Sequence, residues 1–569
     1  MLTSATTFFR AAGLLLSSLL LCGQRAAAQA PLAWVSAQGH RPALTTSTRR
    51  AMDATGNLYE AGTLAGNCVI GGVQLFCQGN YDGYLVKYNP TGTMAWLRQF
   101  SSAGEEQARD VAVDAAGNAY VVGVFSNTIS LGGGQTLSTG TTGRKAFIVK
   151  YDPAGNPLWS QQNTTYPNTC GPMCPPSGLG YAIQVDAVGH VSITGSYYGL
   201  GVDFGFDNLK IASPVAPSST SPHPTFLARF SAATGQAQSV VHALYFDRTT
   251  GVAVIPEQQV LSVPDGGTYL ITPYHMAPYF ATGLSLPTPA GRRMLAAKYN
   301  AAGQLEWART FGSSGYTDLA STATDAAGNL YITGLFMGAL TFGATTLAGR
   351  GNEEGYLVKF SPQGAEQWAQ ALTSSDSDYL QGLCLDAAGN VYVTGSFSNQ
   401  AHLGSAVLTS AGQSDILVAA YTPQGQLSWV QQAGGDEYDE GLSLGFAAPG
   451  RLRLFGYASH QATFGTLGIS NGLYGGFVAE LASTALATTA AQAQPLALYP
   501  NPASTQVHLP GLAAGAKVQV LDVLGRPVRT EMVAPDATIS VQGLPAGQYV
   551  LQATDKQNRP LTSRLTVVD

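Results

Sequence analysis

Acidic side chains recur at matching places in this chain, and carboxylates can bind cations or act as acids and bases. Three short segments carry them: AGEEQARD (103–110), TSSDSDY (373–379) and GGDEYDEG (434–441). Each follows a strand-like run that contains a tryptophan, so we expect the three segments to lie on one face of a repeating fold. One interpretation is that they bind a cation such as calcium, or a basic partner. The favoured interpretation is that they are solvated loop residues that keep the surface soluble.

A second recurring carboxylate belongs to the motif Asp-Ala-Ala-Gly-Asn, which begins at Asp114, Asp325 and Asp386. Aspartate can accept hydrogen bonds from the backbone of a turn, and glycine tolerates the positive φ that tight turns need. A dedicated calcium loop has alternating acidic ligands, and this spacing lacks that alternation. The motif therefore predicts a structural turn in preference to a metal site.

The cysteines include two closely spaced pairs. Cys68 and Cys77 flank IGGVQLF, and Cys170 and Cys174 enclose GPM. Because the chain carries export signals, described below, disulfides within both pairs are expected. A zinc site is disfavoured because it needs four ligands and no histidine lies near either pair in the sequence. Cys384, within QGLCLD, is expected to be a small buried hydrophobic residue on a strand.

Catalytic motifs are otherwise missing from the sequence. GISNG (468–472) matches the G-x-S-x-G pattern of hydrolases, but that motif requires a strand–turn–helix elbow, and its neighbours here are short strands and glycines. The eight histidines are scattered, and no P-loop or dinucleotide fingerprint occurs. The net charge of −6 comes without a Lys/Arg cluster, so nucleic-acid binding is not expected. We therefore predict neither an enzyme activity nor a cofactor.

Aromatic residues are concentrated in two irregular segments, SYYGLGVDFGF (196–206) and PYHMAPYF (273–280). Insertions on a rigid scaffold often carry function, and exposed aromatic rings can stack on sugars or anchor a protein partner. The candidate ligand-binding residues are Tyr197, Tyr198, Tyr279 and Phe280. The favoured alternative is that these side chains fill space left by a missing tryptophan.

A repeat of short strands must position all of these residues. Glycine is abundant (67 residues), 45% of residues are hydrophobic and only 11% are charged, which suits short strands and tight turns. One turn glycine recurs at spacings of 61, 72, 78, 61, 61 and 61 residues, at Gly56, Gly117, Gly189, Gly267, Gly328, Gly389 and Gly450. A second hairpin, such as AFIVKYDPAGNPLW (146–159), completes each unit. The pattern predicts four strands in about 60 residues.

The tryptophans indicate how the repeat ends. Five of them close the last strand of a unit, at Trp96, Trp159, Trp307, Trp368 and Trp429. Trp34 precedes any complete unit, whereas the seventh unit has no tryptophan strand. The two ends are therefore complementary, as a closed ring requires. We predict a seven-bladed β-propeller over residues 31–482, closed by an N-terminal strand. An open solenoid would not need complementary ends.

The repeated pattern YLVKY-x-P-x-G-x-x-x-W, followed by an acidic link and VAVDAAGN-x-Y-V-x-G, resembles the SBBP-type β-propeller repeats of secreted bacterial proteins. The resemblance covers residues 31–482 and is weakest in the fourth unit. It implies a propeller fold and a location at the cell surface or outside the cell, without a defined reaction.

Residues 1–30 have the order of a secretory signal peptide. Arg10 is followed by an apolar run from Ala11 to Cys22 and by small residues ending at Ala30. The run is too short for a membrane span of about 20 residues. A lipoprotein signal is disfavoured because Leu21, which is not small, precedes Cys22. No later segment is apolar enough to span a membrane.

The C-terminal part reads as a linker (483–495) and a small Ig-like β-sandwich (496–569). YPNPAS (499–504), LDVLGRPV (521–528) and LPAGQYVLQ (544–552) resemble the type A sorting domain of the type IX secretion system. The resemblance implies that this machinery is a partner, and that the protein reaches the extracellular space or outer-membrane surface of a Gram-negative bacterium. An ordinary Ig-like adhesive module is the alternative.

Together these features predict a secreted or surface-exposed binding or adhesion protein whose ligand is a glycan or another protein. Two alternatives stay open: a propeller enzyme, hydrolase or lyase, that acts on glycans with carboxylates around its channel, and a purely structural surface module. The ligand and the oligomeric state cannot be deduced from the sequence.

Overall fold

The structure is a computed structural model that describes residues 32–40, 47–140, 143–165, 177–198, 201–204, 210–212, 224–246, 258–289, 291–483, 494–522, 527–554 and 560–568. Within these residues every regular element is a β-strand, so the all-β prediction is confirmed. No helix that could cross a membrane occurs in these ranges. The chain divides into two compact units, one ending at Ala482 and the other beginning at Ser483.

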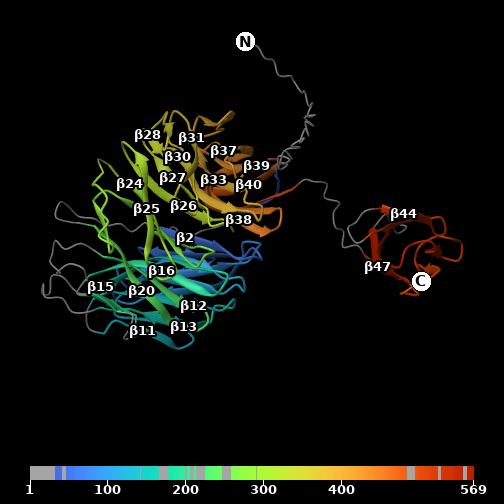
Figure 1. Ribbon diagram of the computed structural model, residues 1–569, viewed down its shortest axis with the longest axis horizontal. Helices are drawn as coiled ribbons and strands as arrows, with labels where there is room; N and C mark the ends of the chain where they lie inside the picture. Colours follow the sequence, from blue (N-terminus) through green and yellow to red (C-terminus); the bar gives the residue numbers. More distant parts are fainter. Residues whose placement is uncertain are drawn as a thin grey trace, which may run out of the picture. The chain divides into compact units, whose positions relative to one another are not determined.

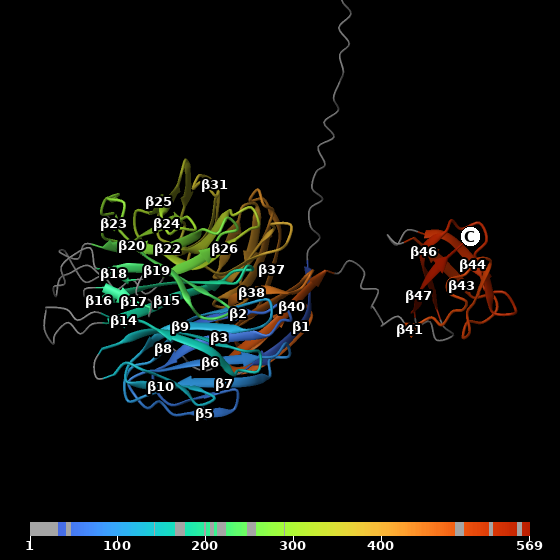
Figure 2. The same ribbon diagram turned by 60° about the horizontal axis from the view of Figure 1, so that its bottom comes forward.

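The first unit is a succession of antiparallel sheets, each built around a set of core strands that follow one another along the chain, with short hairpins between some of them (Figures 1 and 2). The first three sheets hold β2 (Ser47–Met52), β3 (Leu58–Leu64), β6 (Asp82–Tyr88) and β7 (Met94–Phe100); β8 (Gln107–Val113), β9 (Ala119–Phe125), β12 (Lys145–Tyr151) and β13 (Pro157–Gln162); and β15 (Ser177–Val185), β16 (His190–Tyr198), β19 (Thr225–Ser231) and β20 (Ala237–Phe246).

The next three sheets repeat this order. They hold β21 (Gln259–Ser262), β22 (Thr268–Tyr274), β24 (Arg293–Tyr299) and β25 (Leu305–Ser313); β26 (Thr317–Thr324), β27 (Leu330–Phe336), β30 (Glu354–Phe360) and β31 (Glu366–Thr373); and β32 (Tyr379–Leu385), β33 (Val391–Phe397), β36 (Asp415–Tyr421) and β37 (Leu427–Gly435).

The last group of strands joins the two ends of this unit. It contains β38 (Glu440–Ala448), β39 (Arg451–Phe464) and β40 (Leu467–Ser483), and the N-terminal strand β1 (Leu32–His40) pairs with β40 at its edge. The position of Trp34 predicts this pairing. Because β1 comes from the opposite end of the unit, its hydrogen bonds cover an edge that would otherwise be open.

The innermost strands form a closed circle. Each contacts the next, and the last, β38, contacts the first, β2; in order they are β2, β8, β15, β21, β26, β32 and β38. The arrangement is therefore propeller-like: the sheets surround a common centre and the first strand of each sheet faces it (Figures 1 and 2).

Short hairpins extend the sheets outward. Four of these strand pairings join the outermost strand of one sheet to the sheet that follows it: β23 (Pro278–Phe280) with β20, β28 (Ala339–Phe342) with β25, β34 (Gln400–Leu403) with β31, and the end of β39 with β37. Two further hairpins form separate two-stranded sheets: β4 (Cys68–Ile70) with β5 (Val73–Leu75), and β10 (Thr128–Gly132) with β11 (Gln135–Ser138).

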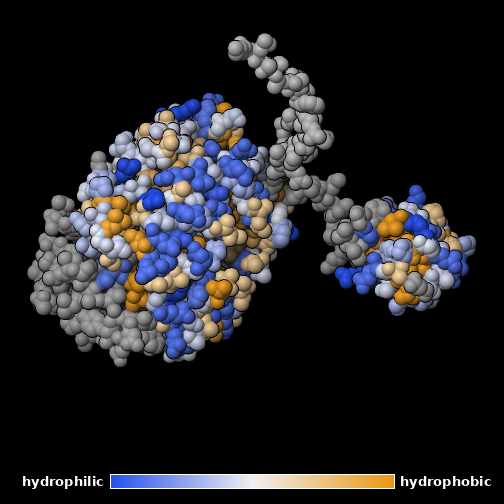
Figure 3. Space-filling model, viewed as in Figure 1, coloured by the Kyte–Doolittle hydropathy of each residue, from blue (hydrophilic) through white to orange (hydrophobic). Residues whose placement is uncertain are grey.

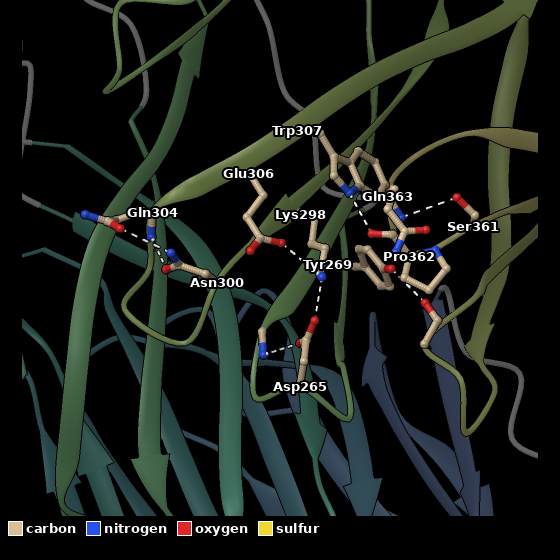
Figure 4. Close-up of polar contacts among 12 residues, drawn as sticks. Asp265, Tyr269, Lys298, Asn300, Gln304, Glu306, Trp307, Ser361, Pro362 and Gln363 are labelled. Atoms are coloured by element: carbon tan, nitrogen blue, oxygen red, sulfur yellow. Dashed lines mark hydrogen bonds and ion pairs between the residues drawn. The ribbon is translucent and has the colours of Figure 1, made fainter.

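The tryptophan of one sheet packs on the hairpin turn of the next. Trp307 donates its indole N–H to the carbonyl of Pro362 at 3.0 Å, which Figure 4 shows, and Gly364 of the same turn lies beneath the ring. A Cβ on Gly364 would stand 2.6 Å from the indole. The same contact joins Trp96 to Pro153, Trp159 to Ala232, and Trp368 to Pro423. The paired Trp and Gly of the repeat therefore hold neighbouring sheets together.

The motif that begins with aspartate is a turn, as predicted. In Asp386 one carboxylate oxygen accepts the N–H groups of Ala388 and Asn390 at 2.9 Å each, and the other accepts the Asn390 amide at 2.8 Å and the Tyr392 hydroxyl at 3.1 Å. Gly389 has a φ of 80°. Protein donors occupy both carboxylate oxygens, so the predicted turn is confirmed.

The second unit has its own core and two small sheets. The larger contains β41 (Gln494–Pro495), β47 (Pro560–Val567), β46 (Gly547–Thr554), β43 (Lys517–Leu521) and β44 (Pro527–Met532), and the smaller pairs β42 (Gln506–His508) with β45 (Thr538–Ser540). Apolar side chains from both sheets, among them Val507, Ile539 and Leu551, are fully or almost fully buried. Such a core allows the unit to fold as a domain.

The face of the first unit seen in Figure 3 is mainly hydrophilic, and its hydrophobic residues gather in small patches. This distribution agrees with a core made inside and between the sheets, where Tyr84, Tyr120 and Tyr356 are completely buried.

Candidate functional site

A polar cavity lies where the innermost strands meet. It encloses about 490 Å³, and β2, β8, β15, β21, β26, β32 and β38 all contribute to its wall. The wall carries charged groups, amides and hydroxyls: Arg49, Arg50, Asp53, Asp110, Gln184, Gln259, Gln381, Ser321, Thr322 and Ser443. Its size and its few convergent polar groups suit a small ligand.

Register shifts in the inner strands decide which side chains face the cavity. The pairing of β8 with β9 shifts between Ala108 and Asp110, and equivalent shifts precede Ser321, Gly382 and Ser443. An extra residue at a β-bulge redirects the side chains that follow it. Asp110, Ser321, Gly382 and Ser443 all line the cavity directly after such a shift.

Asp110 has the most perturbed carboxylate of the cavity wall. Its Oδ1 accepts the N–H of Val111 and its Oδ2 accepts the N–H of Ile183 on the neighbouring inner strand, both at 2.9 Å. Burial raises the pKa of Asp110 to about 6, against the opposing effects of the Arg49 charge and of the two N–H donors. Asp110 can therefore gain or lose a proton near neutral pH.

The two arginines of β2, Arg49 and Arg50, have different charged neighbours. Arg50 pairs with Glu60 at 2.8 Å, and Glu60 also accepts the hydroxyl of Tyr84 at 2.7 Å. Arg49 is half-buried, and its charge lowers the pKa of Asp110. Arg50 is therefore committed to the protein, whereas Arg49 and Asp110 place a positive and a negative charge in the cavity.

Amides and hydroxyls complete the wall. The Gln259 side chain donates to the carbonyl of Ala320 at 2.8 Å and accepts the hydroxyl of Thr322 at 2.5 Å, so β26 fixes its orientation. Gln184 and Gln381 occupy the wall on other strands. A set of oriented amides next to one acid–base pair can hydrogen-bond a polar, hydroxyl-rich molecule.

The predicted aromatic residues do not line this cavity. Tyr197 is buried and its hydroxyl hydrogen-bonds His242 at 3.2 Å, while Phe280 is 3% exposed. Tyr279 is half-buried and stacks on Tyr245 at 5.1 Å. Tyr198 pairs with Ser177 through the backbone of β16. The burial of Tyr197 and Phe280 suits packing, and ligand binding by the four residues stays a prediction.

The cysteine predictions have separate outcomes. Cys68 and Cys77 are free thiols in the structure, so their disulfide stays a prediction. Cys170 and Cys174 lie outside the described residues. Cys384 is on strand β32 and contributes to the cavity wall, where burial raises the pKa of its thiol.

Only some of the acidic side chains in the three acidic segments are solvated, whereas the favoured interpretation expects all of them to be. Asp376 and Asp436 are exposed, as expected, but Glu106, Asp378 and Asp439 are completely buried. These three accept main-chain N–H groups, for example the N–H of Ser459 on Asp439 at 3.0 Å. The expectation is therefore wrong for the buried acids, because backbone donors replace water around them. Among the described residues, no three His, Cys, Asp or Glu side chains gather as metal ligands.

GISNG lies within β40, without the strand–turn–helix elbow that a nucleophilic serine needs. Sequence reasoning missed Arg49 and the cavity role of Asp110. The available signal was their place in the repeat, four residues before the aspartate position of the turn, at Asp53 and Asp114.

Comparison with known proteins gives several distant matches. An uncharacterised WD repeat-containing protein of Acanthamoeba polyphaga mimivirus is 26% identical over 159 residues, which cover 27% of this chain and 11% of the viral protein. A puromycin hydrolase mutant is 12% identical, with 94% of this chain and 61% of that chain covered and a TM-score of 0.39.

Two further solved structures are similar at 10% identity. They are a quinohemoprotein alcohol dehydrogenase from Comamonas testosteroni (TM-score 0.34, covering 83% of this chain and 79% of that chain) and an ulvan lyase of polysaccharide lyase family PL25 (TM-score 0.32, covering 71% and 97%).

The C-terminal unit has a clear relative. The family described as "Secretion system C-terminal sorting domain" matches residues 497–568. This match confirms the predicted sorting domain, and it indicates that the protein is exported through the type IX secretion system to the cell surface or the extracellular space.

Proposed function

We propose that this protein is a secreted, non-enzymatic binding protein that holds a polar ligand in the central cavity of a seven-bladed β-propeller of SBBP-type repeats. In this proposal residues 1–30 are a signal peptide, residues 31–482 the propeller, residues 483–495 a linker and residues 496–569 an Ig-like sorting domain. The observation that carries the proposal is the polar cavity to which every innermost strand contributes.

The composition of the wall favours a neutral, hydroxyl-rich ligand such as a sugar unit of a glycan. Arg49 and Asp110 offset each other's charge, so the wall has no strong preference for an ion of either sign. Gln259, Gln184 and Gln381 offer donors and acceptors that match hydroxyl groups. A glycan ligand also agrees with the export that the sorting domain indicates.

The test is a glycan array followed by calorimetry on the exported chain. We expect binding to a glycan subset, and we expect Gln381→Ala and Arg49→Gln each to weaken it about tenfold, because a hydrogen bond to a ligand contributes about 1–2 kcal/mol. Gln363→Ala, an exposed glutamine on a hairpin turn outside the cavity, is the matched control and should bind normally. Binding that survives both cavity substitutions would place the ligand elsewhere.

A propeller enzyme acting on glycans is the second candidate, and the carboxyl of Asp110 is the observation that favours it. A group with a pKa of about 6 can serve as an acid or base. If the glycan identified on the array is cleaved, Asp110→Asn should abolish turnover and leave binding within about threefold. Intact glycan after long incubation would leave binding as the function.

A further inference from the structure

Three pairs of buried carboxylates lie at equivalent junctions between sheets of the first unit. In each pair one acid begins the third core strand of a sheet and the other precedes or begins the first strand of the next sheet. The pairs are Asp82 with Glu106, Glu354 with Asp378, and Asp415 with Asp439, and none of these residues is more than 1% exposed.

The backbone places the second acid of each pair against the preceding sheet. The N–H of Asp439 donates to the carbonyl of Ser414 at 3.0 Å, and the N–H of Asp378 donates to the carbonyl of Glu353 at 2.8 Å. Ser414 directly precedes Asp415, and Glu353 directly precedes Glu354. The two acids of a pair are thus brought together where one sheet is joined to the next.

Protein donors satisfy the first pair completely. Asp82 accepts the N–H groups of Gln78 and Gly79 and, at 2.7 Å, the amide of Gln99. Glu106 accepts the hydroxyl of Ser102 on one oxygen and the N–H of Ser102 on the other, both at 2.7 Å. All four oxygens of this pair therefore have a hydrogen-bond partner.

The third pair leaves an oxygen without a partner. Asp415 accepts the N–H of Ala411 and the amide of Gln432 on Oδ2, but its buried Oδ1 has no donor. This Oδ1 and Oδ2 of Asp439 lie 2.7 and 3.0 Å from the point where a Cβ on Gly434 would stand. The glycine thus leaves a small space between two carboxylates that face each other.

The second pair shows the same defect. Asp378 accepts the N–H of Ser398 on Oδ1 at 3.1 Å, and its buried Oδ2 has no donor. Glu354 accepts the N–H groups of Gly351 and Ser374. Ser374 therefore contacts the first acid of this pair, and its hydroxyl is near enough to the second to lower the pKa of Asp378.

Two negative charges buried together need a compensating charge. The junction between the fourth and fifth sheets shows another solution: Arg293 and Thr317 occupy the two positions, and their side chains lie around Gly312 as Asp415 and Asp439 lie around Gly434. A guanidinium group and a hydroxyl thus replace the two acids, so these positions hold no pair of buried carboxylates at that junction.

We propose that the Glu354–Asp378 and Asp415–Asp439 pairs each bind one Ca²⁺ ion, which cross-links neighbouring sheets. Carboxylates and other oxygen ligands select hard cations, and Ca²⁺ accepts irregular coordination more readily than Mg²⁺, which retains water and demands an octahedron. The remaining ligands would be main-chain carbonyl oxygens, hydroxyl oxygens or water. Extracellular sites of this kind have dissociation constants of about 0.1–1 mM.

The experiment is calcium titration of the full chain after treatment with a chelator, with melting temperature as the readout. At about 10 mM calcium we expect the melting temperature to rise by about 5 °C, whereas magnesium at the same concentration has little effect. The double variant Asp378→Asn/Asp415→Asn should lose this rise. Asp82→Asn, which alters the pair that is already satisfied, is the matched control and should keep it.

Terbium luminescence gives a second readout that does not depend on a melting transition. Tyr379 and Tyr438 adjoin Asp378 and Asp439 in the sequence and can sensitise a bound lanthanide. We expect two calcium-displaceable terbium ions per chain, and one in either single variant, Asp378→Asn or Asp415→Asn. The proposal is overturned if wild type shows no saturable response to calcium or terbium, or if the double variant responds equally. A chelated double variant that is more stable than wild type, with no calcium effect in either, would indicate a shared proton in place of a cation.

Discussion

At the scale of single residues, the cavity shows how surroundings decide the state of a carboxyl group. Asp53 and Asp110 both line the wall. For Asp53, burial alone would raise the pKa, but hydrogen bonds from Asn57 and Thr55 outweigh it and the pKa is lowered. Asp110 accepts only two N–H groups, so burial prevails and its pKa is raised. The number of donors around each group therefore determines which effect dominates.

The raised pKa of Asp110 predicts a pH-dependent cost to stability. In the unfolded chain this carboxyl ionises near its ordinary pKa of 3.8, whereas in the folded chain it ionises at about 6. Below the ordinary value the group is protonated in both states and costs nothing. Between pH 3.8 and about 6 the unfolded chain loses this proton while the folded chain keeps it, so stability falls over this range and the full cost is present at neutral pH.

We therefore expect Asp110→Asn to raise the free energy of unfolding by about 1–2 kcal/mol near neutral pH, and to change it little near pH 4. Urea denaturation at the two pH values measures this difference. Asp436→Asn, at an exposed position, controls for the general loss of a charge. A destabilised Asp110→Asn protein at neutral pH would mean that attraction to Arg49 exceeds the cost of burial.

At the scale of elements, the contact between tryptophan and turn explains why the repeat combines these residue types. The indole covers the turn of the next sheet and donates to its carbonyl, and only a glycine leaves room beneath the ring, as at Gly364 and Gly425. Lys359 reaches the same carbonyl of Pro423 at 2.9 Å and lies over the ring of Tyr331. One hairpin turn thus receives several side chains from its neighbour.

Two glycines allow the effect of backbone strain to be measured apart from the effect of crowding the tryptophan ring. Gly364 and Gly404 both have a positive φ, of 76° and 58°, but a Cβ on Gly364 would meet Trp307 at 2.6 Å whereas one on Gly404 would meet nothing within 4 Å. Gly404→Ala should cost about 1 kcal/mol of stability through backbone strain alone. Gly364→Ala should cost about 2–4 kcal/mol because it also displaces the ring. Equal losses in chemical denaturation would show that the ring moves aside without cost.

The same elements show what could be predicted from the sequence. The strands and turns could be predicted, because the residue types that form a hairpin are close together in the sequence and recur in unit after unit, as DAAGN and Trp307 illustrate. The cavity could not, because register shifts before Asp110 and Ser443 decide which side chains face inward and no residue type marks them. The burial of Asp378 also could not, because its neighbours come from two different sheets.

At the scale of the whole molecule, the place where the circle closes uses different chemistry from the other junctions. The indole nitrogens of Trp34 and Trp429 are buried without a hydrogen-bond partner among the described residues, unlike that of Trp307. At two other junctions a tyrosine of one sheet donates to the turn of the next: Tyr59 to the carbonyl of Gly117 at 2.8 Å, and Tyr269 to the carbonyl of Gly328 at 2.7 Å. At the closing junction an arginine takes this place.

Arg453 of β39 connects the last sheet to the first. It donates to the carbonyl of Gly56 at 2.6 Å, and its second nitrogen pairs with Glu480 at 3.0 Å. Both side chains are buried, so the guanidinium depends on these partners for its charge and hydrogen bonds. Arg451 also pairs with Glu480, but its side chain is 58% exposed.

The two arginines therefore provide a matched test of ring closure. Arg453→Ala should lower the free energy of unfolding by about 3–5 kcal/mol. It leaves the buried Glu480 paired only with the exposed Arg451, and it removes the side chain that donates to the carbonyl of Gly56. Arg451→Ala removes an exposed pair with the same acid and should cost less than about 1 kcal/mol. Urea denaturation of both variants measures the difference, and limited proteolysis near Gly56 should become faster only in Arg453→Ala. Similar losses in the two variants would mean that neutralising Glu480, and not the bond across the junction, is what stabilises the closed circle.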